Sequence, residues 1–221
     1  FAPLGVFCLI GKFVIADGLD IFQDVLAYVV LLIALLLFHA AFTYSIFLKF
    51  IGGLSPLTFY RKMKDVALFA FSTSSSAATI PVTLRTVNQD LGVNQNVASF
   101  VVPVGATINM DGTAIMQGLA TVFIAQMSGI DLTLFQYIQV VLLAVATSIG
   151  TAAVPSAGTI TLIIILQQFN LPLEAIGIIL AVDRVLDMIR TSVNVTGDAA
   201  IACIVAKTEN QLDENIFNSK A

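Results

Sequence analysis

The chain has 221 residues, of which 58% are hydrophobic and 11% charged, and its formal net charge is −4. Together with a mean hydropathy of +0.96, this composition excludes a soluble globular domain and is typical of a protein that crosses the membrane several times. The chain has no basic stripe of the kind that binds nucleic acid, and its single histidine excludes a histidine-rich metal site.

The first 64 residues predict two membrane helices followed by a basic loop. Residues 1–16 form the first apolar segment, which contains Lys12 and lacks an initiator methionine and a signal-peptide pattern, as expected inside a longer polypeptide. After an acidic loop, residues 25–48 are long enough to cross the ~30 Å hydrocarbon core. The next stretch, 49–64, is the most basic of the chain, and the positive-inside rule therefore places it in the cytoplasm.

Three later segments combine apolar flanks with a polar interruption. In residues 65–87 the interruption is STSSSAATIP at 72–81, which predicts a hairpin of two half-helices that enters and leaves the membrane on one side. Residues 98–127 are broken by GATINMDGT, and residues 140–168 repeat the hairpin pattern around ATSIGTAAVPSAG. Non-helical backbone at membrane depth is tolerated only where it is buried in protein or lines a cavity. Paired broken segments of this kind indicate the binding site of a secondary transporter.

Residues 176–206 predict a spanning helix with a polar stripe. Six polar residues of AVDRVLDMIRTSVNVTGD share one helical face: Asp183, Asp187, Arg190, Thr191, Asn194 and Asp198. A charge at membrane depth costs about 2.5–3.5 kcal/mol by insertion scales, so the stripe must face protein or water. Two interpretations remain, a site for a charged zwitterionic ligand and a structural ion-pair network. Residues 207–221 predict a polar, disordered tail.

Four motifs in this order and spacing resemble the glutamate/aspartate transporters of the dicarboxylate/amino acid:cation symporter family. They are TSSSAATIP (73–81), INMDGT (108–113), SIGTAAVPSAG (148–158) and DRVLDMIRTSVNVTGD (183–198). The resemblance covers essentially the whole chain and corresponds to the C-terminal half of the family. It implies an all-α membrane protein with spanning helices, two re-entrant helical hairpins and a broken helix, forming an elevator-type transporter core. It also implies a homotrimer, built through N-terminal helices that this chain does not contain.

The resemblance divides the chain into three parts. Residues 1–64 hold two transmembrane helices and the basic cytoplasmic loop, residues 65–206 form the transport core, and residues 207–221 form the polar tail. Within the core the implied parts are the first hairpin at 65–87, the broken helix at 98–127, the second hairpin at 140–168 and the striped helix at 176–206.

The resemblance also implies which residues hold the substrate. Arg190 matches the arginine that clamps the side-chain carboxylate of an acidic amino acid, and its planar fork of donors suits a bidentate contact. Asp187 matches the acceptor for the α-ammonium group, although an internal pair between these two side chains at i, i+3 is the alternative. The other implied substrate-binding residues are Thr191, Asn194, Thr113, Ser74, Ser76, Val154 and Gly158.

Three sodium sites are implied in the same way, and oxygen donors suit such a hard cation. The implied ligands are Asp198 with the carbonyls of Gly105, Asn109 and Asn194 for the first site, Thr107 and Met110 with the carbonyls of Ser148, Ile149 and Thr151 for the second, and Asp111 with the Asn109 side chain for the third. Packing is the alternative role for Met110, because a thioether is a poor ligand for sodium.

Two positions depart from the family pattern. Many prokaryotic relatives carry an arginine where this chain has Ser74, and animal relatives carry one where it has Met188. With neither arginine, the charge environment of the substrate carboxylate differs from both patterns.

The expected activity is therefore Na⁺-coupled uptake of L-aspartate or L-glutamate by an elevator mechanism, and not catalysis. The expected location is a lipid membrane, the prokaryotic plasma (inner) membrane. Alternatives are coupling to H⁺, and C4-dicarboxylates or neutral amino acids as substrates. An ion channel lined by the same breaks would be a side activity. An intramembrane protease using Asp111 with Asp187, or a serine with His39, lacks its Gly-x-Gly-Asp or Gly-x-Ser-x-Gly pattern.

Overall fold

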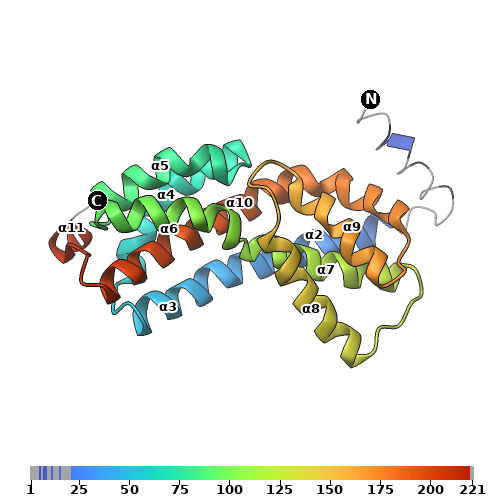
Figure 1. Cartoon of the computed structure of the whole chain (residues 1–221). Helices are drawn as coiled ribbons and strands as arrows, with labels where there is room; N and C mark the ends of the chain where they lie inside the picture. Colours follow the sequence, from blue (N-terminus) through green and yellow to red (C-terminus); the bar gives the residue numbers. More distant parts are fainter. Residues whose placement is uncertain (1–4, 6, 9–10, 12–14, 16–20, 220–221) are drawn as a thin grey trace.

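The computed structural model describes residues 5, 7, 8, 11, 15 and 21–219, and over these residues every regular element is helical (Figure 1). The elements are α2 (Ile21–Phe38), the π-helix η1 (His39–Thr43), α3 (Tyr44–Phe50), α4 (Pro56–Thr73), α5 (Ser76–Gln89), α6 (Gln95–Ile108), α7 (Asp111–Met127), α8 (Leu134–Ile149), α9 (Ala157–Gln168), the 3₁₀-helix η2 (Leu173–Ala175), α10 (Ile176–Thr208) and α11 (Glu214–Asn218). The expected first segment, 1–16, lies largely outside the described residues, and Lys12 is among those left out.

Helix α10 is the axis of the molecule. It is 33 residues long, it packs against α2 to α7 and α9, and Figure 1 shows it running from one end of the bundle to the other. All residues from Val193 to Ala200 are buried, whereas a helix on the surface buries only one stripe. The polar stripe predicted from the sequence therefore faces protein.

Two helical hairpins lie along α10 and point toward each other. Helices α4 and α5 form the first, and α8 and α9 form the second. Figure 1 shows that their tips come together beside the middle of α10. The hydroxyl of Ser75 donates to the carbonyl of Ala153 at 2.8 Å, and the backbone N–H of Ala77 donates to the same carbonyl at 3.2 Å.

All three breaks are shorter than predicted. Helix α4 continues through Thr73 and α5 begins at Ser76, because the Ser75 hydroxyl accepts a hydrogen bond from the N–H of Ala78 and caps α5. Pro81 lies inside α5 rather than ending the break. Between α6 and α7 only Asn109 and Met110 are non-helical. The tip of the second hairpin spans residues 150–156.

The basic stretch expected to be a loop is partly helical. Ser55 caps α4 by accepting a hydrogen bond from the N–H of Thr58, and Pro56 occupies the first helical position. Arg61, Lys62 and Lys64 consequently lie on α4. The Lys62 ammonium donates to the carbonyls of Asp90 (2.8 Å) and Ile216 (2.7 Å), and its burial lowers the pKa of this group.

The expectation of a disordered tail is wrong for residues 207–219. Helix α10 extends to Thr208, and α11 follows after a turn in which Leu212 forms an isolated bridge with Val93. Asp213 caps α11, and the ring of Phe217 is fully buried. The apolar Phe217 side chain therefore gives this polar segment an anchor in the core, which its composition did not reveal.

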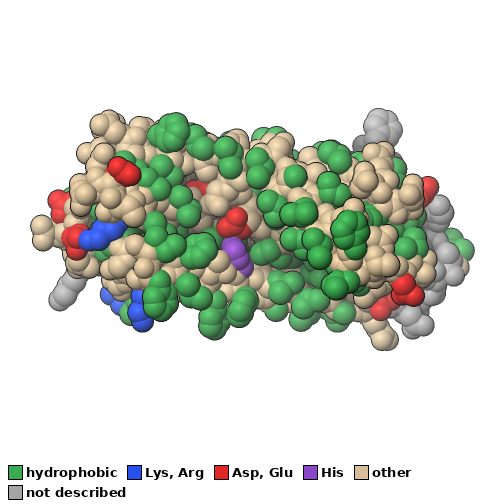
Figure 2. All heavy atoms as spheres, turned by 60° about the horizontal axis from the view of Figure 1, so that its bottom comes forward, with side chains coloured by type: hydrophobic (Ala, Val, Ile, Leu, Met, Phe, Trp, Pro, Cys, Tyr) green, Lys and Arg blue, Asp and Glu red, His purple; other side chains and the backbone are tan. Residues whose placement is uncertain are grey.

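The helix that α2, η1 and α3 form together is long and apolar enough to span a membrane. It runs over 30 residues, Ile21–Phe50; its most apolar 18-residue window has a mean hydropathy of 2.7, and little of that window is buried. It is the only such helix among residues 21–219. Figure 2 shows hydrophobic side chains spread over the face to which α2, α3 and α8 contribute. Leu26, Val30 and Phe42 are exposed on this helix, as expected for a lipid-facing surface.

We expect Phe217→Ala to lower the free energy of unfolding by about 3–5 kcal/mol, because it leaves a cavity under α11. Ile216→Ala, which truncates the more exposed neighbouring side chain, is the matched control and should cost far less. Thermal unfolding of the full-length protein in detergent measures both. Equal effects would mean that α11 is not anchored through Phe217.

Candidate functional site

A narrow cavity lies where the two hairpin tips meet the start of α7 and the middle of α10. Its walls hold every residue that the resemblance implied for substrate binding: Ser74, Ser76, Thr113, Val154, Gly158, Asp187, Arg190, Thr191 and Asn194. Met110, Thr151, Ala152 and Ala153 complete the lining. Wider grooves between α2, α7 and α8 are lined mostly by apolar side chains. The polar residues scattered over four sequence segments therefore converge at one place.

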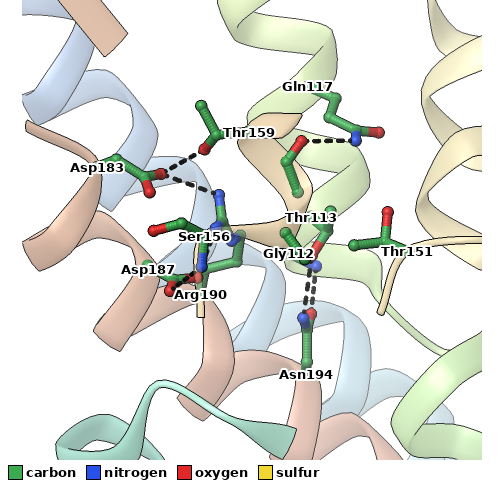
Figure 3. Close-up of polar contacts among 12 residues, drawn as sticks. Gly112, Thr113, Gln117, Thr151, Ser156, Thr159, Asp183, Asp187, Arg190 and Asn194 are labelled. Carbon is green, nitrogen blue, oxygen red and sulfur yellow. Dashed lines mark hydrogen bonds and ion pairs between the residues drawn. The ribbon is translucent and has the colours of Figure 1, made fainter. Parts of the chain in front are cut away.

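A buried guanidinium lies between two carboxylates at this cavity (Figure 3). Nη2 of Arg190 is 2.5 Å from Oδ1 of Asp187, and Nη1 is 3.6 Å from Oδ1 of Asp183. All three side chains are almost fully buried. The internal pair at i, i+3 therefore exists, and in the interior one guanidinium faces two carboxylates.

The second hairpin is attached to the same two carboxylates. The backbone N–H of Ser156 donates to Oδ2 of Asp187 at 2.9 Å, and the hydroxyl of Thr159 donates to Oδ1 of Asp183 at 2.6 Å. Ser156 has φ = 60°, in the left-handed region that is costly for a residue other than glycine. The hairpin tip is thus held in a strained conformation by a charged partner.

The first hairpin presents Ser74 to the cavity. Ser74 also has a positive φ, 51°, and its hydroxyl is buried without a hydrogen-bond partner among the described residues. An unsatisfied buried hydroxyl costs about 1–3 kcal/mol. Such a group in the wall of a cavity is suited to bind a ligand.

Gln117 is a site residue that the sequence analysis missed. Its fully buried amide donates to the carbonyl of Gly158 (3.0 Å) and to the hydroxyl of Thr161 (2.8 Å), and it accepts from the hydroxyl of Thr147 (2.8 Å). One side chain thereby joins α7, α8 and α9. An uncharged amide within an apolar segment was the only signal that could have identified it.

Asn194 joins α10 to the start of α7. Its Oδ1 accepts from the backbone N–H of Gly112 at 2.8 Å, and its Nδ2 donates to the hydroxyl of Thr113 at 3.3 Å. A Cβ on Gly112 would lie 3.0 Å from Oδ1 of Asn194 and 3.1 Å from the Arg190 carbonyl. Glycine at this position therefore allows α7 to begin directly against the charged stripe.

Three members of the first implied sodium site come together beneath the cavity. Nδ2 of Asn109 donates to Oδ1 of the buried Asp198 at 3.0 Å. A Cβ on Gly105 would lie 2.6 Å from the same oxygen, so the backbone of α6 approaches the carboxylate closely. The fourth, Asn194, lies one turn earlier on α10, and its side chain points to Gly112.

His39 lies close to Asp111, one of the implied sodium ligands. Its Nε2 lies 3.2 Å from Oδ2 of Asp111, and the hydroxyl of Tyr44 donates to the same oxygen at 3.1 Å. His39 opens the π-helix η1, and the Tyr60 hydroxyl donates to the carbonyl of Ala40 in it. The π-helix therefore brings His39 to Asp111, whereas the Asn109 side chain expected beside Asp111 is bonded to Asp198.

The implied ligands of the second sodium site come together only in part. Met110 and Thr151 share the cavity wall, and the Ser148 carbonyl accepts a hydrogen bond from the N–H of Thr151 at 3.1 Å. Thr107 is exposed and its hydroxyl bonds to Val104 of its own helix. Ile149 is also exposed. Over residues 21–219 no three His, Cys, Asp or Glu side chains cluster, so a cation would depend on carbonyl and amide oxygens.

The model of the sodium:dicarboxylate symporter family matches residues 1–208. The chain belongs to this family. The resemblance seen in the four motifs is thereby confirmed, and the family is one of transporters rather than enzymes. Membership also makes the apolar helices those of an integral membrane protein.

Several animal transporters are similar to this chain. It is 42% identical over 207 residues to an excitatory amino acid transporter of Caenorhabditis elegans, covering 93% of the chain and 41% of the relative. Identity to the human excitatory amino acid transporter 2 is 42%, with 93% and 36% covered. Identity to the mouse excitatory amino acid transporter 3 is 40%, with 100% and 42% covered. The chain spans about two fifths of the length of these relatives. The animal relatives give no support to the expected prokaryotic plasma (inner) membrane.

We expect Gln117→Leu to loosen the second hairpin, because it removes the hydrogen bonds from α7 to Thr147, Gly158 and Thr161. Each such hydrogen bond contributes about 0.5–1.5 kcal/mol. Hydrogen exchange of the α9 amides measures the loosening. Gln126→Leu, on the exposed face of the same helix, is the control, and equal exchange in the two variants would contradict the role given to Gln117.

Proposed function

We propose that this chain forms the substrate-binding part of a symporter that takes up an acidic amino acid, L-aspartate or L-glutamate, together with Na⁺. The observation that supports the proposal most strongly is the buried pair of Arg190 and Asp187 in the wall of a cavity closed by two hairpin tips. Opposite charges on one helical face suit a ligand that carries both an ammonium group and carboxylates. The names of the relatives, excitatory amino acid transporters, support the same substrate class.

The substrate exchanges with the internal ion pair. Its side-chain carboxylate binds the guanidinium of Arg190, and its α-ammonium group binds the carboxylate of Asp187. Each buried charge therefore keeps a partner of opposite charge. Asn194 and Thr191 face the α-carboxylate. The remaining residues close around the ligand: Ser74, Ser76, Thr113, Val154 and Gly158.

This charge pattern also separates the competing substrates. A neutral amino acid leaves the guanidinium without a new partner, and a C4-dicarboxylate leaves Asp187 without an ammonium group. A buried charge that loses its partner costs about 3–5 kcal/mol. Both alternatives are therefore weaker than an acidic amino acid.

Sodium is the proposed co-substrate. Asp198 with Asn109 and Gly105 is the best assembled of the implied positions, and Asp111 beside Tyr44 is another. Binding of Na⁺ neutralises the negative charge of these carboxylates and orders the break between α6 and α7. The two remaining groups are proposed from the resemblance alone: the Asn194 carbonyl for the first site, and Thr107, Met110, Ser148, Ile149 and Thr151 for the second. Protons are the alternative coupling ion.

Movement is proposed to follow an elevator mechanism. Residues 65–206 form the transport core, in which the α4–α5 and α8–α9 hairpins are re-entrant, and residues 1–64 hold membrane helices that support it. The core slides through the lipid membrane against a homotrimeric scaffold formed by the rest of the polypeptide. The membrane potential contributes about 2.3 kcal/mol per charge for every 100 mV.

Uptake by the full-length protein in proteoliposomes tests the proposed function. We expect radiolabelled L-aspartate to accumulate under an inward Na⁺ gradient and not under an inward H⁺ gradient. Accumulation under an H⁺ gradient alone would be consistent with transport of L-aspartate but would contradict the proposed sodium sites. If neither gradient drives uptake, C4-dicarboxylates become the substrates to test.

We expect Arg190→Ala to lower L-aspartate uptake at least 100-fold, because the substrate carboxylate loses its buried partner and such a loss costs about 3–5 kcal/mol. Arg184→Ala removes an exposed arginine from the same helix and is the matched control. Unchanged aspartate uptake in Arg190→Ala would reject the assigned role of the guanidinium.

We expect Gly105→Ala to weaken activation by Na⁺ about tenfold or more, since the new Cβ would lie 2.6 Å from Oδ1 of Asp198 and must displace the carboxylate. The control is Gly118→Ala, where nothing lies within 4 Å of an added Cβ. The Na⁺ concentration for half-maximal aspartate binding is the measurement. Identical values in the two variants would contradict a cation site at Asp198.

A further inference from the structure

Thr159 and Asp183 form a buried hydrogen bond that the proposed function does not use. The Thr159 hydroxyl, on α9 of the second hairpin, donates to Oδ1 of Asp183 on α10 at 2.6 Å. Neither side chain lines the cavity between the hairpin tips. Figure 3 shows the two groups on the far side of Arg190 from Asn194. Their only link to the proposed ligand is the guanidinium.

Thr159 and Arg190 approach the same carboxylate oxygen of Asp183. Nη1 of Arg190 is 3.6 Å from Oδ1 of Asp183, which is within ion-pair distance but too long for a hydrogen bond. The shorter contact to the Thr159 hydroxyl holds the carboxylate in this position, out of hydrogen-bond reach of the guanidinium. As a result, Nη1 of Arg190 and Oδ2 of Asp183 are both buried with no hydrogen-bond partner among the described residues.

In this arrangement the Arg190 guanidinium has a direct hydrogen bond to only one of the two carboxylates. Asp187 binds Nη2 at 2.5 Å, while Asp183 contributes its charge without a direct hydrogen bond. A guanidinium carries five donors, so its unbonded Nη1 is available to a second carboxylate. A hydrogen bond to a charged group is among the stronger ones in a protein, and its presence or absence changes an equilibrium by about tenfold or more.

We propose that Thr159 and Asp183 are positioning residues that set how strongly α10 retains Arg190, and thereby the affinity for the side-chain carboxylate of the substrate. This inference rests on the proposed function. When the Thr159 hydroxyl is in place, it holds the Asp183 carboxylate beyond hydrogen-bond distance of Nη1, and the substrate has one internal hydrogen bond to replace. Without that hydroxyl, Asp183 bonds Nη1 and the substrate must displace two carboxylates.

The arrangement couples the second hairpin to substrate affinity. Thr159 and Ser156 belong to the same hairpin, and they contact Asp183 and Asp187 respectively. When the hairpin moves away from α10, the Thr159 hydroxyl leaves Asp183, which then retracts the guanidinium. Opening of the hairpin therefore weakens the grip on the substrate carboxylate and favours release.

Binding of L-aspartate to the full-length protein at saturating Na⁺ tests the inference by calorimetry. Thr159→Val removes the hydroxyl at nearly constant shape, and we expect it to raise the Kd about tenfold. Thr159→Ser keeps the hydroxyl and should stay within about twofold of the unchanged protein. Asp183→Asn removes the charge through which Thr159 acts, so Thr159→Val should have no further effect in that background.

If Thr159 had only a structural role, the affinities of these variants would differ from the expected ones. Thr159→Val and Thr159→Ser would then have equal affinities, or the effect of Thr159→Val would persist in the Asp183→Asn background, and either outcome overturns the inference. Na⁺ binding without substrate should be the same in Thr159→Val and Thr159→Ser. If Asp183→Asn does not fold, the comparison of valine with serine decides alone. An unchanged protein that binds no acidic amino acid overturns the proposed function together with this inference.

Discussion

The structure depends on a guanidinium that is buried between two carboxylates in the middle of α10. A buried ion pair of this kind contributes little to stability, because desolvation offsets most of the attraction, but removing one partner is costly. Arg190 and its partners must therefore be enclosed by protein wherever the helix lies in the membrane. The two hairpins that cover them are the enclosure, and the contacts of Ser156 and Thr159 show that the carboxylates also hold one of these hairpins in place.

Close approach of backbone to side chain is the second constraint. Gly105 and Gly112 allow α6 and α7 to contact Asp198 and Asn194 directly, and Gly197 does the same for the hydroxyl of Tyr44. Each contact would be blocked by a methyl group. The broken helix is thus fitted to α10 on both sides of its interruption, so that its backbone lies directly against Asp198 and Asn194.

Periodicity and motif order predicted the main elements, because the stripe on α10 and the polar tips are local patterns in the sequence. The cavity lining followed from the resemblance to the family, residue by residue. What could not be predicted depends on contacts between distant segments. The extents of the breaks depend on the capping of α5 by Ser75, the order of the C-terminal segment depends on burial of Phe217, and the approach of His39 to Asp111 depends on a π-helix. No single window of sequence contains these partners.

The π-helix η1 connects α2 and α3, and it sets which face of α3 continues the buried face of α2. Tyr28, Leu32 and Leu36 are buried before it, and Tyr44 and Leu48 are buried after it. A π turn holds one residue more than an α turn, and one residue corresponds to about 100° of rotation. In a continuous α-helix the eight residues from Leu36 to Tyr44 would turn the seam of α3 by about 80° away from the seam of α2, whereas the wider π turn keeps both seams against α10. The backbone conformation of this short segment is therefore as much a determinant of the site as its composition.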